Sequence, residues 1–501
     1  MIYTDIFKLF GNGNSELVKD QFYKIMSLWR DWYRGNVPDF HKYTIKTVAG
    51  KTKECDKKSL QMAKQVCEDM VSMLWNDKTG IVVPESFSSR LAEILKLNNF
   101  KKAFPDFLEK ALALGNGVIV EYLEDGEPSI DFINGDLQVP LEWNNGRITK
   151  IAILSQMVED KTYFNHLTVH NTGRDDNGRI FYEVEHRLYQ SDDKDELGDL
   201  IDLALKFPDL AENTKAKKLW ADANKKVAIY KLRFMDTTPL FQMVRPAIAN
   251  NYLLNCPLGI SIYANCLDIL KAVDNKYDNF DMEYTLGKRR VMVTSEALKK
   301  EMQQDAEGNV SYTSYFDTEE TAFMALPIDG NALQSPVLPV DFTIRHESFI
   351  AGINEDLGIL SYKVGLGEGF YSFDESRGLK TAREVVSEQS KLFRSKHKHQ
   401  ELLNDVLVNM VMGLYYIESV LNKNKKIGTV KSEDIKIVFD DSIIEDRDTE
   451  RTLAISEVNN GLRSKMSYLK EFRDLNEAES EAELELIKKD IPEAGTLPPL
   501  G

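Results

Sequence analysis

Two short stretches come close to known catalytic or nucleotide-binding motifs, and each fails at one residue. His346-Glu-Ser-Phe-Ile350 begins like H-E-x-x-H, but isoleucine stands where the second zinc-binding histidine is needed. One histidine and one glutamate do not hold a catalytic zinc ion by themselves. Gly365-Leu-Gly-Glu-Gly369 begins like G-x-G-x-x-G, but the third glycine of that motif falls on Phe370, and no strand is predicted before it. We therefore expect neither a zinc centre nor a dinucleotide site at these stretches.

The other residues that could do chemistry are scattered along the chain. No G-x-x-x-x-G-K-[ST] motif occurs, which excludes a P-loop ATPase, and the seven histidines form no recognisable triad. His397 and His399 are two residues apart, so they lie on different faces of a helix and cannot share a metal. With their basic neighbours they form a segment that is either a solvated helix face or a contact to DNA or to acidic helices: Lys391, Arg394, Lys396 and Lys398. We expect a non-enzymatic protein that needs no metal and no cofactor.

Charge, cysteines and hydropathy narrow the protein class further. The formal net charge is -17, whereas proteins that bind DNA in a groove usually carry a basic patch. An acidic lining still suits a channel through which DNA slides, because tight phosphate pairing would slow the movement. Cys55, Cys67, Cys256 and Cys266 show no C-x-x-C spacing and are expected as reduced thiols. The first residues lack signal-peptide features and the apolar run 406–417 is too short to span a bilayer, so we expect a soluble cytoplasmic protein.

The first half of the chain reads as helices followed by β-hairpins. Its length of 501 residues favours two or more domains. Helical periodicity predicts helices at 14–34, 59–75, 86–97 and 100–114. The period then changes to two, with Asp-Gly and Asn-Gly turn pairs, which predicts strands at 118–122, 130–133, 137–141, 147–154, 162–170, 180–190 and 227–234. A helix is also expected near 195–206. The fold class is therefore α+β.

The second half is organised around three helices and a glycine-rich loop. A helix over 264–286 has apolar residues at near-heptad spacing, and a second helix, with Asp341 as a possible cap, covers 342–359. Between them, 288–338 reads as short strands and turns, with a strand at 290–294 and a short helix at 295–304. Three glycines and several aromatic residues then interrupt the helical pattern over 361–379.

A third helix is expected from about 380 to 421. At about 1.5 Å per residue, such a helix would be roughly 60 Å long, which suits a large assembly better than one compact domain. A strand at 434–439 and acidic helices at 445–459 and 464–489 follow, and the last residues read as a loose tail.

This ordered series resembles the portal proteins of tailed bacteriophages, in the type found in phages of Gram-positive hosts. In that family a stem helix ends in a tunnel loop, and the long helix that follows opens with a stretch similar to Thr381-Ala-Arg-Glu-Val385. The early Trp32-Tyr33 followed by Gly35, and Ala63 with Cys67, are similar to two further family segments. The resemblance implies a portal architecture with these parts: a wing at 1–255, a first stem helix at 256–287, a clip at 288–338, a second stem helix at 339–360, a tunnel loop at 361–379, a long wing helix and strand at 380–442, and a crown with tail at 443–501.

The resemblance also implies a function and partners. The chain would be one subunit of a ring, usually of twelve copies, at the capsid vertex, through which double-stranded DNA is packaged and ejected. Its partners would be other copies of itself, DNA, the terminase large subunit, and capsid, scaffold and neck or head-completion proteins, with no membrane. It would be found in the virion, and in the host cytoplasm during assembly. Two alternatives remain open: another structural virion protein of the head or neck, and a hydrolase whose site is not recognised.

Three groups of residues are expected to serve this function. The tunnel loop would use Lys363, Gly365, Gly367, Glu368, Gly369, Phe370, Tyr371, Phe373, Asp374, Glu375 and Arg377, with charged side chains towards the channel and aromatic ones packing the loop against its neighbours. The stem would pack through Leu267, Leu270, Val273, Tyr277, Phe280, Tyr284, Ile350, Ile353 and Leu357. The clip would dock the motor or a neck protein through Lys288, Arg289 and Arg290.

Overall fold

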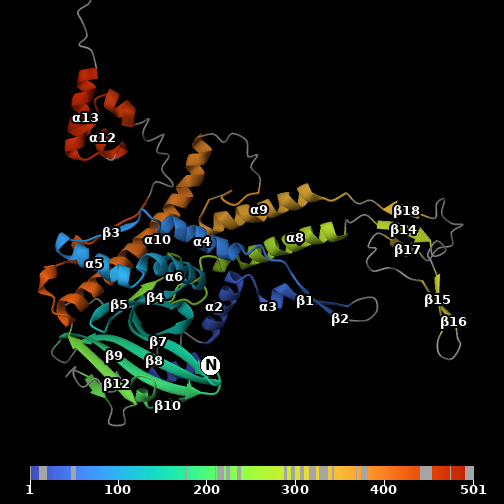
Figure 1. The fold of residues 1–501 in the computed structure, drawn as a ribbon, viewed down its shortest axis with the longest axis horizontal. Helices are drawn as coiled ribbons and strands as arrows, with labels where there is room; N and C mark the ends of the chain where they lie inside the picture. The colour runs from blue at the N-terminus through green and yellow to red at the C-terminus, as the bar shows by residue number, and fades with distance from the viewer. Residues whose placement is uncertain are drawn as a thin grey trace, which may run out of the picture. The chain divides into compact units, whose positions relative to one another are not determined.

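The computed structural model describes most of the chain and divides it into two compact units (Figure 1). Unit 1 comprises Met1–Leu74 and Ile81–Ile437, and unit 2 comprises Trp75–Gly80 and Val438–Gly501. The described residues are 2–10, 20–46, 52–174, 178–208, 210, 219–221, 226–233, 239–286, 290–294, 300–304, 310–314, 323–326, 337–340, 343–367, 369–373, 382–440, 454–473 and 475–490.

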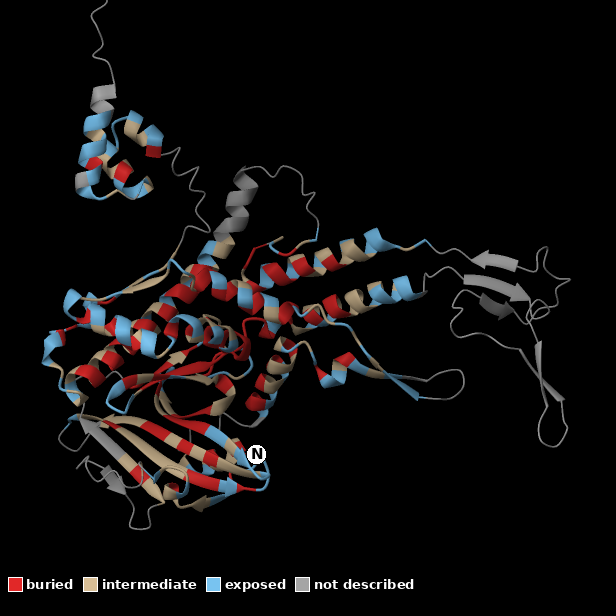
Figure 2. Cartoon of the chain, in the orientation of Figure 1, coloured by how far each residue is buried: buried red, intermediate tan, exposed pale blue. Residues whose placement is uncertain are grey.

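Helices open unit 1: α1 (Ile2–Phe10), α2 (Asp20–Tyr33), α3 (Pro38–His41), α4 (Met62–Leu74), α5 (Glu85–Leu97) and α6 (Phe100–Leu114). The periodicity predicts α2, α4, α5 and α6, but it does not predict α1 or the short α3. The predicted apolar face of α4 is buried, and so are Trp29 and Trp32 of α2 (Figure 2). These helices form a layer in which α4 packs against α2 and α6.

Two antiparallel sheets follow the helices. The smaller one has the order β13-β4-β5, from β4 (Gly117–Glu124), β5 (Glu127–Asn134) and β13 (Phe241–Val244). The larger one has the order β11-β12-β9-β8-β7-β6, with β10 beside β9. Its strands are β6 (Gln138–Asn144), β7 (Arg147–Glu159), β8 (Thr162–Arg174), β9 (Ile180–Ser191), β10 (Asp199–Ile201), β11 (Leu219–Ala221) and β12 (Val227–Arg233). Asn145 and Gly146, both with positive φ, form the tight turn between β6 and β7, as their sequence predicts.

The helix expected near 195–206 is wrong. Gly198 has φ +84°, and a Cβ there would lie 2.0 Å from the carbonyl oxygen of Gln190, so the chain turns back directly against β9. β10 then pairs with β9, and only a 3-10 turn at Leu203–Leu205 follows. The short helix expected at 295–304 is also wrong over its described part, because Lys300–Gln304 is β15, which pairs with β16 (Val310–Ser314). In both places strand pairing with a segment close by in the sequence overrides local helical preference.

Three long helices complete unit 1. They are α8 (Leu267–Leu286), α9 (His346–Val364) and α10 (Ala382–Tyr416), and a π-helical segment, Ile417–Leu421, continues α10. α10 packs against α4, β4 and β13, and Ile417 joins a buried apolar cluster with Val118, Ile151 and Phe241. Between α8 and α9 lie β15 and β16 and a three-stranded sheet of β14 (Arg290–Thr294), β17 (Phe323–Leu326) and β18 (Val337–Val340).

Unit 2 contains a small helical group. A helix covers 454–459, and α12 (Lys465–Phe472) and α13 (Glu477–Asp490) follow it. The single helix predicted at 464–489 is thus two helices. Asn476 explains the break, because its side chain accepts from the backbone N–H of Glu479, while the Glu479 carboxylate accepts from the backbone N–H of Asn476, which is a capping box.

Candidate functional site: the helix pair and the glycine loop

α8 and α9 lie side by side and are joined by a series of contacts along their length (Figure 1). Near the start of α8, Lys363 Nζ donates to the backbone oxygen of Asn265 at 2.7 Å. Further along, Lys276 Nζ donates to the Gly352 oxygen at 2.9 Å and lies 2.7 Å from an Asp356 carboxylate oxygen. The two helices are therefore joined by polar contacts at two separate positions along their length.

The far end of the pair carries an aromatic contact and an ion pair. The rings of Phe280 and Phe349 have centroids 5.6 Å apart. One turn further, the Arg345 guanidinium donates to both carboxylate oxygens of Glu283, each at 3.0 Å. This hydrogen-bonded pairing lowers the pKa of Glu283. Arg345 is exposed and Glu283 is half-buried, so we assign to this ion pair a role in orienting the two helices more than in stabilising them.

The residues expected to pack the two helices differ in burial. Leu270, Val273, Ile353 and Leu357 are buried. Leu267, Tyr277, Phe280 and Ile350 are half-buried, and Tyr284 is exposed. Burial thus decreases along α8 away from its start (Figure 2).

Asp274 attaches α8 to the helical layer through its buried carboxylate. Its buried carboxylate accepts from His41 Nε2 at 3.0 Å, Ser59 Oγ at 2.8 Å and the backbone N–H of Leu60 at 2.8 Å. The backbone N–H of Val37 donates to His41 Nδ1, so the imidazole proton sits on Nε2. Three donors compensate the burial of this charge. The helical pattern alone cannot reveal this role, because the partners His41, Ser59 and Leu60 are far away in sequence.

Gly365 ends α9 and starts the glycine loop. Its φ is +90°, and the backbone N–H of Leu366 donates to the Ser361 oxygen at 2.9 Å, as in a Schellman motif. A Cβ at Gly365 would also lie 2.4 Å from Ser395 Oγ on α10. The helix therefore extends four residues beyond the expected end at 360. Lys363, expected in the tunnel loop, lies instead in the last turn of α9.

The described part of the loop folds back onto its own subunit. Tyr371 is buried, and its hydroxyl donates to Asp69 Oδ2 of α4 at 2.7 Å. The backbone N–H of Phe373 donates to Asn354 Oδ1 at 2.9 Å, while the rings of Phe370 and Phe373 are exposed. Of the other predicted loop residues, Gly367 and Gly369 have positive φ. Glu368, Asp374, Glu375 and Arg377 lie outside the described residues, as do Lys288 and Arg289 of the clip; Arg290 begins β14.

The basic segment of α10 is not simply a solvated face. Lys396 is only 1% exposed, and His399 is also buried, which lowers the pKa of His399. Lys391 Nζ donates to the Tyr362 backbone oxygen at 2.6 Å and lies over the Tyr362 ring. At least three of these basic and imidazole groups therefore help to pack α10 against the rest of unit 1.

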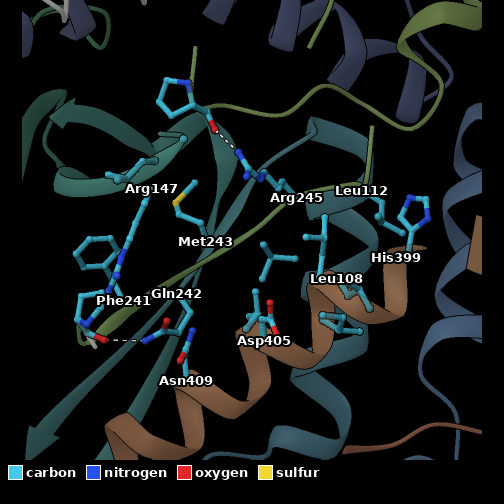
Figure 3. A pocket seen from close by; sticks show the side chains of 18 of the residues that line it. Leu108, Leu112, Arg147, Phe241, Gln242, Met243, Arg245, His399, Asp405 and Asn409 are labelled. Atoms are coloured by element: carbon cyan, nitrogen blue, oxygen red, sulfur yellow. Dashed lines mark hydrogen bonds between the residues drawn. The ribbon is translucent and has the colours of Figure 1, made fainter. Parts of the chain in front are cut away.

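A cleft of about 520 Å³ is lined by residues of α10, β13 and the β6–β7 turn (Figure 3). Two of its polar side chains bond to the backbone: Arg245 Nη1 donates to the Pro257 oxygen at 2.9 Å, and Gln242 Nε2 to the Pro239 oxygen at 2.7 Å. Within the described ranges, no group of three or more His, Cys, Asp or Glu residues could hold a metal ion. Among those same ranges, no helix is both long and apolar enough to cross a membrane.

Comparison with known proteins finds similarity over nearly the whole chain. A family model described as "Phage portal protein, SPP1 Gp6-like" matches residues 18–496. A solved structure titled "Neck of native GTA particle computed with C12 symmetry" aligns with 8% identity and a TM-score of 0.38, over 81% of this chain and 88% of that chain, which is too weak to carry structural detail. No curated protein sequence matches. Because the family model covers nearly the whole length, the chain belongs to the SPP1 Gp6-like family of phage portal proteins.

Proposed function

We propose that copies of this chain close into a ring, of twelve subunits, whose central channel passes double-stranded DNA during packaging and ejection. The chain is a portal subunit, which is a structural and non-enzymatic component of the capsid vertex. The observation that supports the ring most directly is the bridged pair α8 and α9, which leads into the glycine loop and α10 within a chain of the portal family.

Simple geometry makes a DNA channel reasonable. Helices pack about 10 Å apart, so twelve of them around a circle have centres on a diameter of roughly 38 Å. Subtracting one helix thickness of about 10 Å leaves roughly 28 Å, which admits a duplex about 20 Å wide. In this arrangement each subunit interface would be obligate and would bury roughly 2,000–5,000 Å².

The proposed division of labour follows the expected parts. Residues 1–255 and 380–442 form the wing, α8 and α9 form the stem, 361–379 form the tunnel loop, and 443–501 form the crown. The clip at 288–338 docks the terminase large subunit and later neck or head-completion proteins, and other surfaces meet capsid and scaffold. Assembly takes place in the cytoplasm of a host that we propose to be Gram-positive, and the chain ends up in the virion.

Imaging of the purified full-length protein tests this proposal. We expect negative-stain electron micrographs to show rings with an axial channel, and light scattering to report a mass many times that of one chain. A strictly monomeric species at every salt and protein concentration would contradict the proposal. Rings without a channel wide enough for duplex DNA would contradict its DNA-conducting part.

A further inference from the structure

The glycine loop returns to the helix turn that it leaves. Ser361 is fully buried in the last turns of α9, where its Oγ donates to the Leu357 oxygen at 2.7 Å. The same Oγ accepts from the backbone N–H of Tyr371 at 3.1 Å. One hydroxyl thus ties a loop residue ten positions later to the helix body. The first half of the loop, residues 365–367 and 369–373, is therefore attached to α9. We call this segment the loop base.

Tyr371 extends this attachment to a third element. Its ring is 9% exposed, and its hydroxyl reaches Asp69 Oδ2 on α4 at 2.7 Å. The other carboxylate oxygen of Asp69 accepts from Gln65 Nε2 at 3.0 Å, so the acceptor is itself held in place. Burial, followed by the hydrogen bond and charge of Asp69, raises the pKa of Tyr371, which keeps the phenol protonated as a donor. A hydrogen bond to a charged acceptor is among the stronger ones in proteins.

The remaining contacts leave the loop base little freedom. Phe373 donates its backbone N–H to Asn354 Oδ1, two turns back along α9 from Ser361. Gly365, Gly367 and Gly369 have φ values of +90°, +92° and +82°, which only glycine adopts readily, so the turns between these contacts are fixed by residue type. α4, the helix that carries Asp69, itself packs against α2, α6 and α10.

We propose that Tyr371 is a positioning residue, which fastens the base of the tunnel loop to α4 of the same subunit and thereby sets where the loop enters the channel. The Tyr371–Asp69 hydrogen bond then links the loop mechanically to α4 of the wing. A displacement of α4 moves the loop base with it, and breaking the bond frees the base from α4. The channel part of this proposal rests on the proposed function; the anchoring part does not.

Hydrogen exchange on the full-length protein tests the anchor directly. The Tyr371→Phe variant keeps the aromatic ring but loses the hydroxyl group and its hydrogen bond to Asp69. We expect the amides of 366–373 to exchange roughly tenfold to a hundredfold faster than in the wild type, as loss of a charged hydrogen bond predicts. Asp69→Ala should give the same acceleration, and the double variant should add little to either single change. Asp69→Asn, which retains an acceptor, should fall in between. Tyr362→Phe, which removes the hydroxyl of an exposed tyrosine on α9, is the matched control and should leave exchange unchanged.

A DNA-packaging assay then distinguishes a positioning role of Tyr371 from a role in side-chain packing alone. With Tyr371→Phe rings that assemble and melt as the wild type does, we expect the amount of DNA packaged or retained per head to fall severalfold. Unchanged exchange of 366–373 in Tyr371→Phe would overturn the anchor. Faster exchange with normal packaging and retention would overturn the positioning role. Absence of rings in the wild type would count against the proposed function alone, because the exchange measurement needs no DNA.

Discussion

Glu121 is a carboxyl group that the fold keeps out of water. It lies on β4 and is 1% exposed, and its burial outweighs the hydrogen bond from Gln242, which favours the charged form. Gly413 of α10 faces it, since a Cβ there would approach Glu121 Oε2 to 3.3 Å. Burial raises the pKa of Glu121 well above its usual value, so the side chain is a neutral acid in the folded protein.

The raised pKa of Glu121 makes stability depend on pH. Above the unfolded-state pKa, the unfolded chain has released this proton while the folded chain still holds it. The stabilising contribution is therefore complete at acidic pH and declines as pH rises towards the folded-state pKa. We expect Glu121→Gln to melt close to the wild type near pH 4 and at an increasingly higher temperature than the wild type from pH 5 to pH 8, measured by calorimetry. An offset for Glu121→Gln that does not change with pH would contradict the neutral-acid interpretation.

At this scale, sequence alone identifies residues whose conformation is set locally. Gly365 could be recognised because only glycine ends a helix with positive φ at low cost. Asp274 and Tyr371 could not be recognised, because their partners His41 and Asp69 are separated from them by 233 and 302 positions. A buried carboxylate and an exposed one look the same in a helical pattern until the opposing element is known.

The pair of α8 and α9 shows which bridges matter at the scale of elements. Lys276 serves two acceptors on α9, one of them the carboxylate of Asp356, whose side chain is 13% exposed. Lys271, five residues earlier on α8, pairs with Asp268 of the same helix, whose side chain is 97% exposed. The first bridge joins two helices in a partly buried setting, whereas the second lies on one helix in water, where such pairs add little.

Replacing each lysine by methionine tests this difference. We expect Lys276→Met to lower the free energy of unfolding by about 1 kcal/mol, because Asp356 loses its partner, with some discount for the exposed part of the lysine. Lys271→Met should change it by less than about 0.5 kcal/mol. Denaturant titrations of both variants give the comparison. Equal effects would mean that the helix pair is held by its apolar contacts alone, and a cycle with Asp356→Asn would show whether the bridge is the cause.

Elements with strong periodicity were predicted well, and their ends less well. α4 and the β6–β7 hairpin follow from apolar spacing and an Asn-Gly turn. The start of α9 does not: Asp341 was the expected cap, but the helix begins at His346, and Arg345 at its N-cap makes no side-chain capping bond. Arg345 instead pairs with Glu283 of α8, so a contact between helices accompanies this boundary in place of a local cap.

At the scale of the whole molecule, the order of elements carries more information than any motif. The glycine loop and the partial zinc motif indicate no chemistry. The order of long helix, short strands, second helix, glycine loop and third long helix predicts the family that the family model matches. The order of elements reflects the assembly that the subunit must build. The geometry of that assembly restricts the choice of residue at many positions, but only weakly at each one. This explains why the family could be recognised from sequence while its loop anchor and its buried charges could not.

The charges directly after α8 lead to a prediction about docking. Lys288 and Arg289 follow the last residue of α8, Leu286, in a chain of net charge -17. A local cluster of cations on an acidic molecule steers association with an acidic partner, and reversing it slows association and weakens its salt dependence. We expect Lys288→Glu with Arg289→Glu to leave ring formation intact and to reduce the association rate with the terminase large subunit about tenfold at low salt, measured by surface plasmon resonance.

Lys425→Glu with Lys426→Glu, in an exposed turn after α10, changes the net charge equally and is the matched control. If both double variants slowed association equally, the net charge of the molecule, and not the charges in the proposed clip, would be the cause. If Lys288→Glu with Arg289→Glu left binding unchanged, these two residues would be excluded from motor docking.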